Sequence, residues 1–305
     1  MKTLTLCDGA MNASQIILGC MRISNMEDSA VETLVRTAME QGVNFFDHAD
    51  IYGGGQSESV FARALHMNPA LREKMILQSK CGIRPGQYDF SKEHILSSVE
   101  GSLKRLNTEY LDVLLLHRPD TLMEPEEVGE AFERLHESGK VRYFGVSNQN
   151  PLTMQLLQSG LKQKLRFNQM QLSLTNSGMI DQSLYANMQV NRGLWRDGGV
   201  LEYCRLNKIT LQAWSPMQYG FFEGVFLGSD KFPALNKKID EIAERYGVTG
   251  TAVAIAWILR HPAGIQPILG TTSVNRVIES CRAADFTLTR AEWYELYQAA
   301  GEPLP

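Results

Sequence analysis

The 305-residue sequence predicts one α/β domain folded as a (β/α)8 TIM barrel. Eight short apolar runs alternate with longer segments whose apolar residues recur at helical spacing, and this alternation favours parallel strands. Runs such as Val113–Leu116 are apolar at every position, which is typical of strands covered on both faces. No Pro/Ser-rich linker divides the chain, so we expect a single domain over residues 1–305.

The predicted strands have a spacing that suits eight strand-and-helix units in about 250 residues. In chain order they are Ile16–Gly19, Asn44–Phe46, Ile76–Ser79, Val113–Leu116, Tyr143–Val146, Arg166–Gln169, Ile209–Ala213 and Pro267–Leu269.

The segments between the strands carry helix signals. Apolar residues at positions 31, 34, 35 and 38 lie on one helical face. Pro125 opens and Gly139 closes another predicted helix, and Asn150 with Pro151 provides the cap and first turn of the next.

Two segments depart from the alternation. Residues 2–12, with a turn at Asp8 and Gly9, are expected to form a small hairpin that plugs the barrel floor. The segment Gln171–Gly199, rich in Asn, Ser, Met and Gly, is too long for an ordinary connection, so we expect a functional loop over the site.

Composition excludes several classes of protein. The chain is 44% hydrophobic and 21% charged with a net charge of −4 and no basic run, so neither nucleic acid nor an anionic membrane is an expected partner. Five scattered cysteines without CxxC spacing argue against a disulfide framework and a zinc site. The N-terminus lacks a signal peptide and no apolar run is long enough to span a membrane, so a cytoplasmic location is expected.

Four polar residues near consecutive strand ends are candidates for catalysis. Asp47, Lys80 and His117 follow the second, third and fourth predicted strands, and Tyr52 lies five residues beyond Asp47. Reactive groups of a (β/α)8 barrel lie at the carboxyl ends of its strands, so these four can meet. Taken singly, Asp47, Tyr52 and Lys80 are more easily explained as caps or solvated loop residues, and His117 is as easily explained as a packed core histidine. Chance does not readily place reactive residues at the ends of three neighbouring strands.

Together, these four residue types could form a site that donates a proton. An ammonium such as that of Lys80 stabilises a phenolate and is predicted to lower the Tyr52 pKa, and Asp47 would keep the lysine charged and in place. His117 could donate a hydrogen bond that orients a carbonyl oxygen toward the phenol.

These residues lie in motifs that closely resemble the aldo-keto reductases. FFDHADIYGGGQSE is similar to the family signature, and SKCG and LLLHRPD resemble its lysine and histidine motifs. GVSN, NQ, AWSPM and ILGTTSVNRVIES follow in the family's order, so the resemblance runs from about Ile16 to Ser280. It maps the catalytic tetrad onto Asp47, Tyr52, Lys80 and His117.

The resemblance implies an NADPH-dependent reductase of a small-molecule aldehyde or ketone, with Tyr52 as general acid. It implies that Ser147, Asn148 and Gln169 hold the nicotinamide carboxamide and that the ring stacks on Trp214. Loops after the seventh and eighth strands commonly bind phosphate in this fold. The remaining cofactor-binding residues that it implies are Gly19, Ser215, Met217, Gly220, Gly270, Thr271, Thr272, Arg276, Glu279 and Ser280.

The adenosine end departs from the family pattern. Arg276 matches the arginine that pairs with the 2′-phosphate, but Gly270 stands where many members have lysine and Ser280 where many have asparagine. The preference for NADPH over NADH is therefore expected to be modest.

Substrate contacts are expected from loops around the mouth of the barrel. Met21, Arg22 and Ile83 are the predicted contacts, with Arg22 either meeting an acidic substrate or a cofactor phosphate or lying in solvent. Further walls are expected from the segments Ile83–Phe90, Gln171–Gly199 and Gln218–Phe222.

Two other functions are compatible with such a barrel. The channel β-subunits share the fold and a YGGGxSE-like segment, so a cofactor-binding regulatory or redox-sensing module is the alternative. A metal-dependent hydrolase would need a His/Asp/Glu cluster at the strand ends, and the sequence offers none. The sequence makes no prediction about oligomeric state.

Overall fold

A computed structural model describes residues 1–191, 194, 197–301 and 304, and its centre is a closed barrel of eight parallel strands. Every predicted strand is present, with ends that differ by no more than two residues, so the (β/α)8 prediction is confirmed. The barrel strands are β3 (Ile17–Gly19), β4 (Phe45–Asp47), β5 (Ile76–Cys81), β8 (Leu111–Leu116), β9 (Val141–Ser147), β10 (Leu165–Gln171), β11 (Thr210–Trp214) and β14 (Gln266–Leu269).

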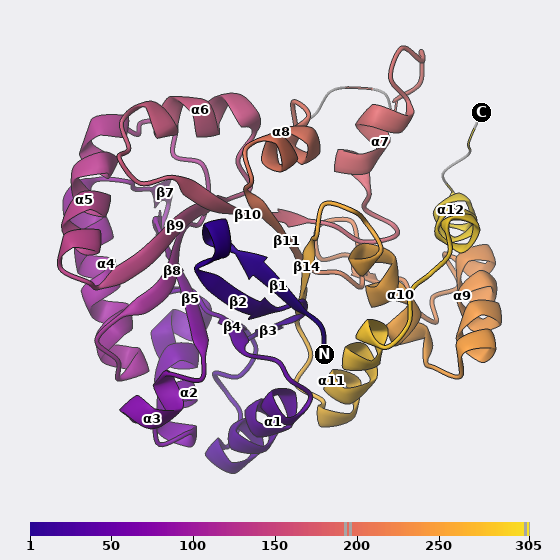
Figure 1. Cartoon of the computed structure of the whole chain (residues 1–305), viewed down its shortest axis with the longest axis horizontal. Helices are drawn as coiled ribbons and strands as arrows, with labels where there is room; N and C mark the ends of the chain where they lie inside the picture. Colours follow the sequence, from indigo (N-terminus) through magenta and orange to yellow (C-terminus); the bar gives the residue numbers. More distant parts are fainter. Residues whose placement is uncertain (192–193, 195–196, 302–303, 305) are drawn as a thin grey trace.

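Helices surround the barrel, and their buried apolar residues join one hydrophobic core (Figure 1). In α1, for example, Val31, Leu34, Val35 and Ala38 are fully buried, which is the periodicity seen in the sequence. The helices are α1 (Asp28–Glu40), α2 (Gln56–Ala64), α3 (Pro69–Arg72), α4 (Lys92–Leu106), α5 (Pro125–Glu137), α6 (Pro151–Ser159), α7 (Gly178–Leu184), α8 (Val200–Leu206), α9 (Pro233–Tyr246), α10 (Gly250–Leu259), α11 (Val274–Cys281) and α12 (Arg290–Ala299).

An N-terminal hairpin closes one end of the barrel, as predicted. It consists of β1 (Thr3–Leu6), the 3-10 turn η1 (Cys7–Gly9) and β2 (Met11–Ser14), and it lies across the barrel centre in Figure 1. Met11 and Ala13 of the hairpin pack against interior residues of six barrel strands, Ile17, Phe45, Ile76, Val113, Phe167 and Ile268 among them. The hairpin therefore closes this end of the barrel, and the strand carboxyl ends lie at the opposite end.

Two small hairpins extend from strand carboxyl ends, namely β6 (Ile83–Arg84) with β7 (Gln87–Tyr88), and β12 (Gln218–Tyr219) with β13 (Gly224–Val225). Two further 3-10 turns lie elsewhere in the chain: η2 (Tyr52–Gly55) precedes α2, and η4 (Arg282–Ala284) follows α11.

The described residues of the segment Gln171–Gly199 include a helix that the sequence did not predict. This helix is α7, and the first residues of the segment support the β12–β13 hairpin: Gln171 Nε2 donates to the Gly220 carbonyl at 2.6 Å and Ser173 Oγ to the Gln218 carbonyl at 2.7 Å.

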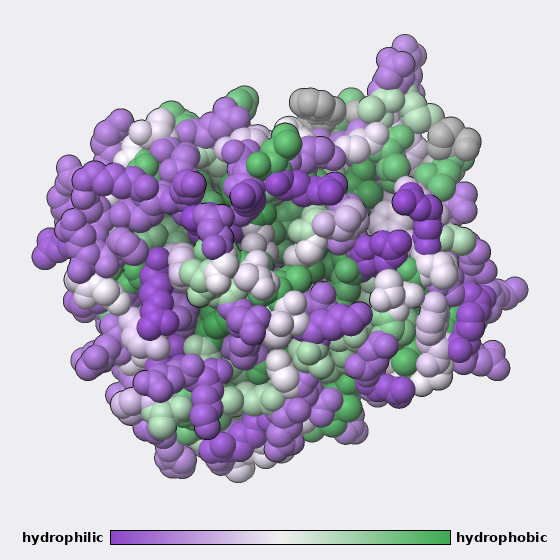
Figure 2. All heavy atoms as spheres, in the orientation of Figure 1, coloured by the Kyte–Doolittle hydropathy of each residue, from purple (hydrophilic) through white to green (hydrophobic). Residues whose placement is uncertain are grey.

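The outer surfaces of the helices are polar. Figure 2 shows hydrophilic side chains over α4 and α5 on one side of the molecule and over α9 on the other. Among the helices described, none combines the length and the hydropathy needed to cross a membrane.

Candidate active site

Three neighbouring strands bring the predicted tetrad together. Asp47 ends β4, Lys80 lies in β5, and His117 follows β8 directly, while Tyr52 begins the η2 turn. Lys80 Nζ donates to Asp47 Oδ2 at 2.8 Å, to the His48 carbonyl at 2.8 Å and to Tyr52 Oη at 2.9 Å. The Lys80 side chain is fully buried, and these three acceptors satisfy all three of its ammonium protons.

Burial controls the proton affinity of the phenol. Burial raises the pKa of Tyr52, the charge of Lys80 opposes that rise, and the Asp47 carboxylate adds to it. The prediction of a lowered Tyr52 pKa is therefore wrong: Lys80 acts in the predicted direction, but the loss of solvation is the larger effect. Tyr52 consequently keeps its proton at neutral pH.

The two neighbours of the phenol differ in charge. Burial opposes the charge of Lys80, but Asp47 and Tyr52 outweigh it and raise the pKa of the ammonium. For His117, burial together with the charges of Lys80 and Arg118 holds the imidazole pKa well below its usual range. The Tyr52 and His117 rings meet edge to face with centroids 5.9 Å apart, so the phenol lies between a charged ammonium and a neutral imidazole.

A layer of glutamines beneath the tetrad fixes Asp47. Asp47 Oδ1 accepts hydrogen bonds from the Nε2 atoms of Gln78 and Gln169. These amides also donate to Gln212 Oε1, at 2.9 and 3.1 Å, which ties β5, β10 and β11 together across the barrel. Gln78 and Gln212 are fully buried and were not singled out from the sequence, although a glutamine within a buried apolar strand is itself a signal of an interior polar network.

A second set of polar contacts pins the loop that carries Tyr52. Glu58, fully buried in α2, accepts from Ser79 Oγ at 2.6 Å and from Arg105 Nε at 2.7 Å. Ser79 directly precedes Lys80, so two adjacent residues of β5 hold the two ends of the loop. Gly53 in the loop has φ +58, and a Cβ there would lie 2.4 Å from Ser24 Cβ, so the turn requires glycine.

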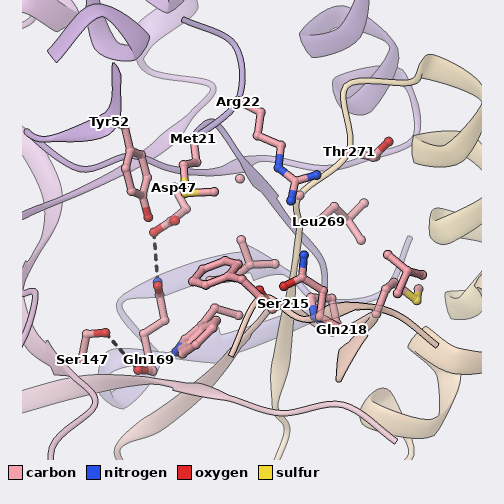
Figure 3. A pocket seen from close by; sticks show the side chains of 18 of the residues that line it. Met21, Arg22, Asp47, Tyr52, Ser147, Gln169, Ser215, Gln218, Leu269 and Thr271 are labelled. Atoms are coloured by element: carbon pink, nitrogen blue, oxygen red, sulfur yellow. Dashed lines mark hydrogen bonds between the residues drawn. The ribbon is translucent and has the colours of Figure 1, made fainter. Parts of the chain in front are cut away.

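A cavity of about 790 Å³ opens above the tetrad (Figure 3). Most predicted site residues line it, namely Gly19, Met21, Arg22, Asp47, Tyr52, Ile83, His117, Ser147, Asn148, Gln169, Trp214, Ser215, Met217, Gly270, Thr271, Arg276 and Ser280. Lys80 lies behind Asp47 and Tyr52, and Gly220, Thr272 and Glu279 are not part of the lining.

Other parts of the lining differ from the predictions. The described residues of Gln171–Gly199 do not line the cavity, and residues 192–193 and 195–196 of this predicted wall lie outside the described part of the chain. The start of the segment supports the β12–β13 hairpin. Of the Ile83–Phe90 loop only Ile83 contributes, whereas Gln218 and Phe222 do line the cavity as expected. The lining residues that were not predicted as site residues are Ile51, Gly53, Arg118, Pro216, Val225, Leu227, Thr251, Ile268 and Leu269.

One corner of the cavity presents amide and hydroxyl groups. Ser147 Oγ donates to the Gln169 carbonyl at 3.0 Å and accepts from Asn148 Nδ2 at 2.7 Å, while Trp214 Nε1 donates to Asn148 Oδ1 at 3.1 Å. Gln169 Oε1 accepts no hydrogen bond from the described residues. The Phe222 ring lies nearly parallel to Trp214, with centroids 5.7 Å apart and planes at 25°.

The opposite corner is formed by the start of α11. Ser273 caps the helix by accepting from Arg276 N, and Thr271 Oγ1 accepts from Ser273 N at 3.1 Å. Ser280 Oγ donates to the Arg276 carbonyl at 2.7 Å. The Arg276 side chain is exposed and forms no ion pair within the described part of the chain, so it is available to an anion.

Over residues 1–191, 194, 197–301 and 304, no group of three or more His, Cys, Asp or Glu side chains is placed to hold a metal ion. A buried ammonium, phenol and carboxylate meet instead at the strand ends of the barrel.

Comparison with known proteins gives the family. The family model described as "Aldo/keto reductase family" matches residues 15–300, and the chain belongs to this family. It is therefore an NAD(P)H-dependent oxidoreductase.

Individual relatives agree with this assignment. The chain is 37% identical over 302 residues to the uncharacterized oxidoreductase YcsN of Bacillus subtilis, covering 94% of each chain. It is 36% identical over 314 residues to a 6-dehydroglucose reductase of Agrobacterium fabrum, covering 98% of each. A crystal structure of an aldo-keto reductase from Klebsiella pneumoniae in complex with NADPH superposes with a TM-score of 0.79 at 26% identity, covering 99% of this chain and 96% of the other.

Proposed function

We propose that this protein reduces an aldehyde or ketone to an alcohol with NADPH and that Tyr52 donates the proton. The observation that carries the proposal is the position of Lys80 Nζ, 2.8 Å from Asp47 and 2.9 Å from Tyr52 at the edge of the cavity. The NADPH in the complex of the Klebsiella relative supports the choice of cofactor.

The polar corner of the cavity fits a nicotinamide carboxamide. A primary amide needs an acceptor for its N–H groups and a donor for its carbonyl. Gln169 Oε1 is an available acceptor, and Asn148 Nδ2 has a second proton beyond the one given to Ser147. Trp214 provides an aromatic face for a flat ring.

The α11 corner fits a phosphate. Thr271 and Arg276 line the cavity there, and an unpaired guanidinium is suited to the 2′-phosphate that distinguishes NADPH from NADH. Gly270 supplies no second cation, so NADH remains the alternative, weaker cofactor.

Each residue of the tetrad has a separate role in the proposed reduction. The bound cofactor supplies the hydride. Tyr52, whose raised pKa keeps it protonated, gives its proton to the oxygen of the substrate as negative charge develops there. Lys80 stabilises the phenolate that remains, Asp47 holds Lys80, and neutral His117 donates a hydrogen bond to the carbonyl oxygen.

The names of two relatives suggest which substrates to test first. Two of the similar proteins are named 6-dehydroglucose reductase, at 36% and 34% identity. A sugar aldehyde therefore belongs in the first panel of substrates, with aliphatic and aromatic aldehydes.

Steady-state oxidation of NADPH, followed by absorbance with this panel, tests the proposal. Turnover of at least one aldehyde is expected. Tight NADPH binding without turnover of any aldehyde would refute the enzymatic function and would favour the regulatory module.

A further inference from the structure

Arg118, the residue after His117, is a half-buried cation in the cavity wall. Its guanidinium carbon lies 5.9 Å from the ring centroid of Trp214 and 5.7 Å from that of Phe221. These distances are typical of cation–π contacts. Throughout the described residues, Arg118 forms neither an ion pair nor a side-chain hydrogen bond, so aromatic faces position the side chain while its five N–H donors stay available.

The cavity offers this cation no anion of its own. Asp47 is the one acidic residue among the described residues that line it, and both of its carboxylate oxygens are engaged by Lys80, Gln78 and Gln169. Asp120, two residues beyond Arg118, is also committed: its oxygens accept from the backbone amides of Phe90 and Leu122. A partly desolvated guanidinium without a negatively charged partner is stabilised by binding an anionic ligand.

The other cations of the cavity lie toward the α11 corner. In Figure 3 the Arg22 side chain points to the side of Leu269 and Thr271 and away from Tyr52. Arg276 belongs to α11 itself. Arg118, by contrast, follows β8 next to His117, on the side where the carbonyl would be reduced.

We propose that Arg118 binds a carboxylate of the substrate, so that the site prefers carbonyl compounds that carry a carboxylate over neutral ones. The inference rests on the proposed reductase function, because it places the reacting carbonyl beside Tyr52 and His117. The planar guanidinium matches a carboxylate with two parallel hydrogen bonds, a geometry that a lysine ammonium cannot reproduce.

The test compares 4-carboxybenzaldehyde with 4-formylbenzamide, which has a similar shape without the charge. Arg118→Met keeps the reach of the side chain and removes its charge. We expect it to lower kcat/KM for the carboxylate by about 10- to 100-fold relative to the amide, the range typical of a lost charge-assisted hydrogen bond. Arg118→Lys should recover part of the difference, and Arg22→Met, the matched loss of a cation on the other wall, should affect both aldehydes by the same factor.

Two results would overturn the proposal. One is an equal loss for both aldehydes in Arg118→Met. The other is a loss for glyceraldehyde, measured against propanal, as large as that for the carboxylate, because Arg118 would then recognise hydroxyl groups rather than charge.

A binding measurement keeps the proposal independent of turnover. Calorimetric titration with terephthalate and terephthalamide should show tighter binding of the dianion in the wild type and no such preference in Arg118→Met. If no aldehyde of the full panel is reduced but terephthalate shows this dependence, the reductase function fails while Arg118 remains an anion-binding residue. If both aldehydes are reduced and the dependence is absent, only the role of Arg118 fails.

Discussion

Replacing Lys80 with methionine removes the ammonium and keeps most of the apolar stem. Nζ lies 2.9 Å from Tyr52 Oη, and with an effective dielectric constant of about 20 a full charge on that oxygen would interact by roughly 6 kcal/mol. If about half a negative charge develops on the phenol in the transition state, the loss is about 3 kcal/mol, or roughly 100-fold in kcat. NADPH affinity should change little, because Lys80 does not line the cavity.

The assay is steady-state reduction of a reactive aldehyde, with NADPH binding followed by fluorescence titration. The pH dependence of the reverse reaction adds a second readout. Alcohol oxidation needs the phenolate, and without Lys80 nothing opposes the effect of burial on the Tyr52 pKa, so the rise of activity with pH should move to higher pH. A Lys80→Met protein that binds NADPH normally and keeps kcat within threefold of the wild type would contradict this role of Lys80.

Three further predictions concern charge elsewhere in the molecule. Arg276→Ala should weaken NADPH by about 10- to 100-fold and NADH far less, and equal losses in fluorescence titrations would remove the 2′-phosphate assignment. Because the His117 pKa lies well below its usual range, the imidazole is already neutral at its usual pKa of about 6.5, so kcat/KM for reduction should show no limb there; a limb near pH 6.5 that disappears in His117→Gln would contradict the neutral imidazole. Asp112→Ala, which breaks the buried pair with Arg72, should lower the free energy of unfolding in urea by about 3–5 kcal/mol, whereas Asp28→Ala, which breaks an exposed pair with Arg63, should change it little.

Hydrophobic periodicity was sufficient to predict the barrel. The apolar run Val113–Leu116 is buried at every position, and the apolar residues of α1 lie on its buried face. The spacing of apolar residues therefore reports which faces of an element are buried. The meeting of Asp47, Lys80 and His117 followed from the same reasoning, because parallel strands deliver their carboxyl ends to one edge.

The sequence could not show whether burial or the charge of Lys80 would have the larger effect on the Tyr52 pKa. Lys80 and Asp47 were visible as neighbours of Tyr52, but the burial that raises the Tyr52 pKa depends on the packing of the whole barrel mouth. The same holds for Gln78 and Gln212, whose bonds join strands more than a hundred residues apart in the chain. Likewise, the contacts of Gln171 and Ser173 with the β12–β13 hairpin join residues more than forty positions apart, which no local pattern records.

The proton donated by Tyr52 is the centre of the proposed mechanism, and Tyr52→Phe tests it with the least change in shape. With NADPH bound, the single-turnover rate of aldehyde reduction, followed by loss of NADPH absorbance, should fall by about 10²- to 10⁴-fold. The affinity for NADPH should stay close to that of the wild type. A wild-type rate in Tyr52→Phe would show that another group supplies the proton.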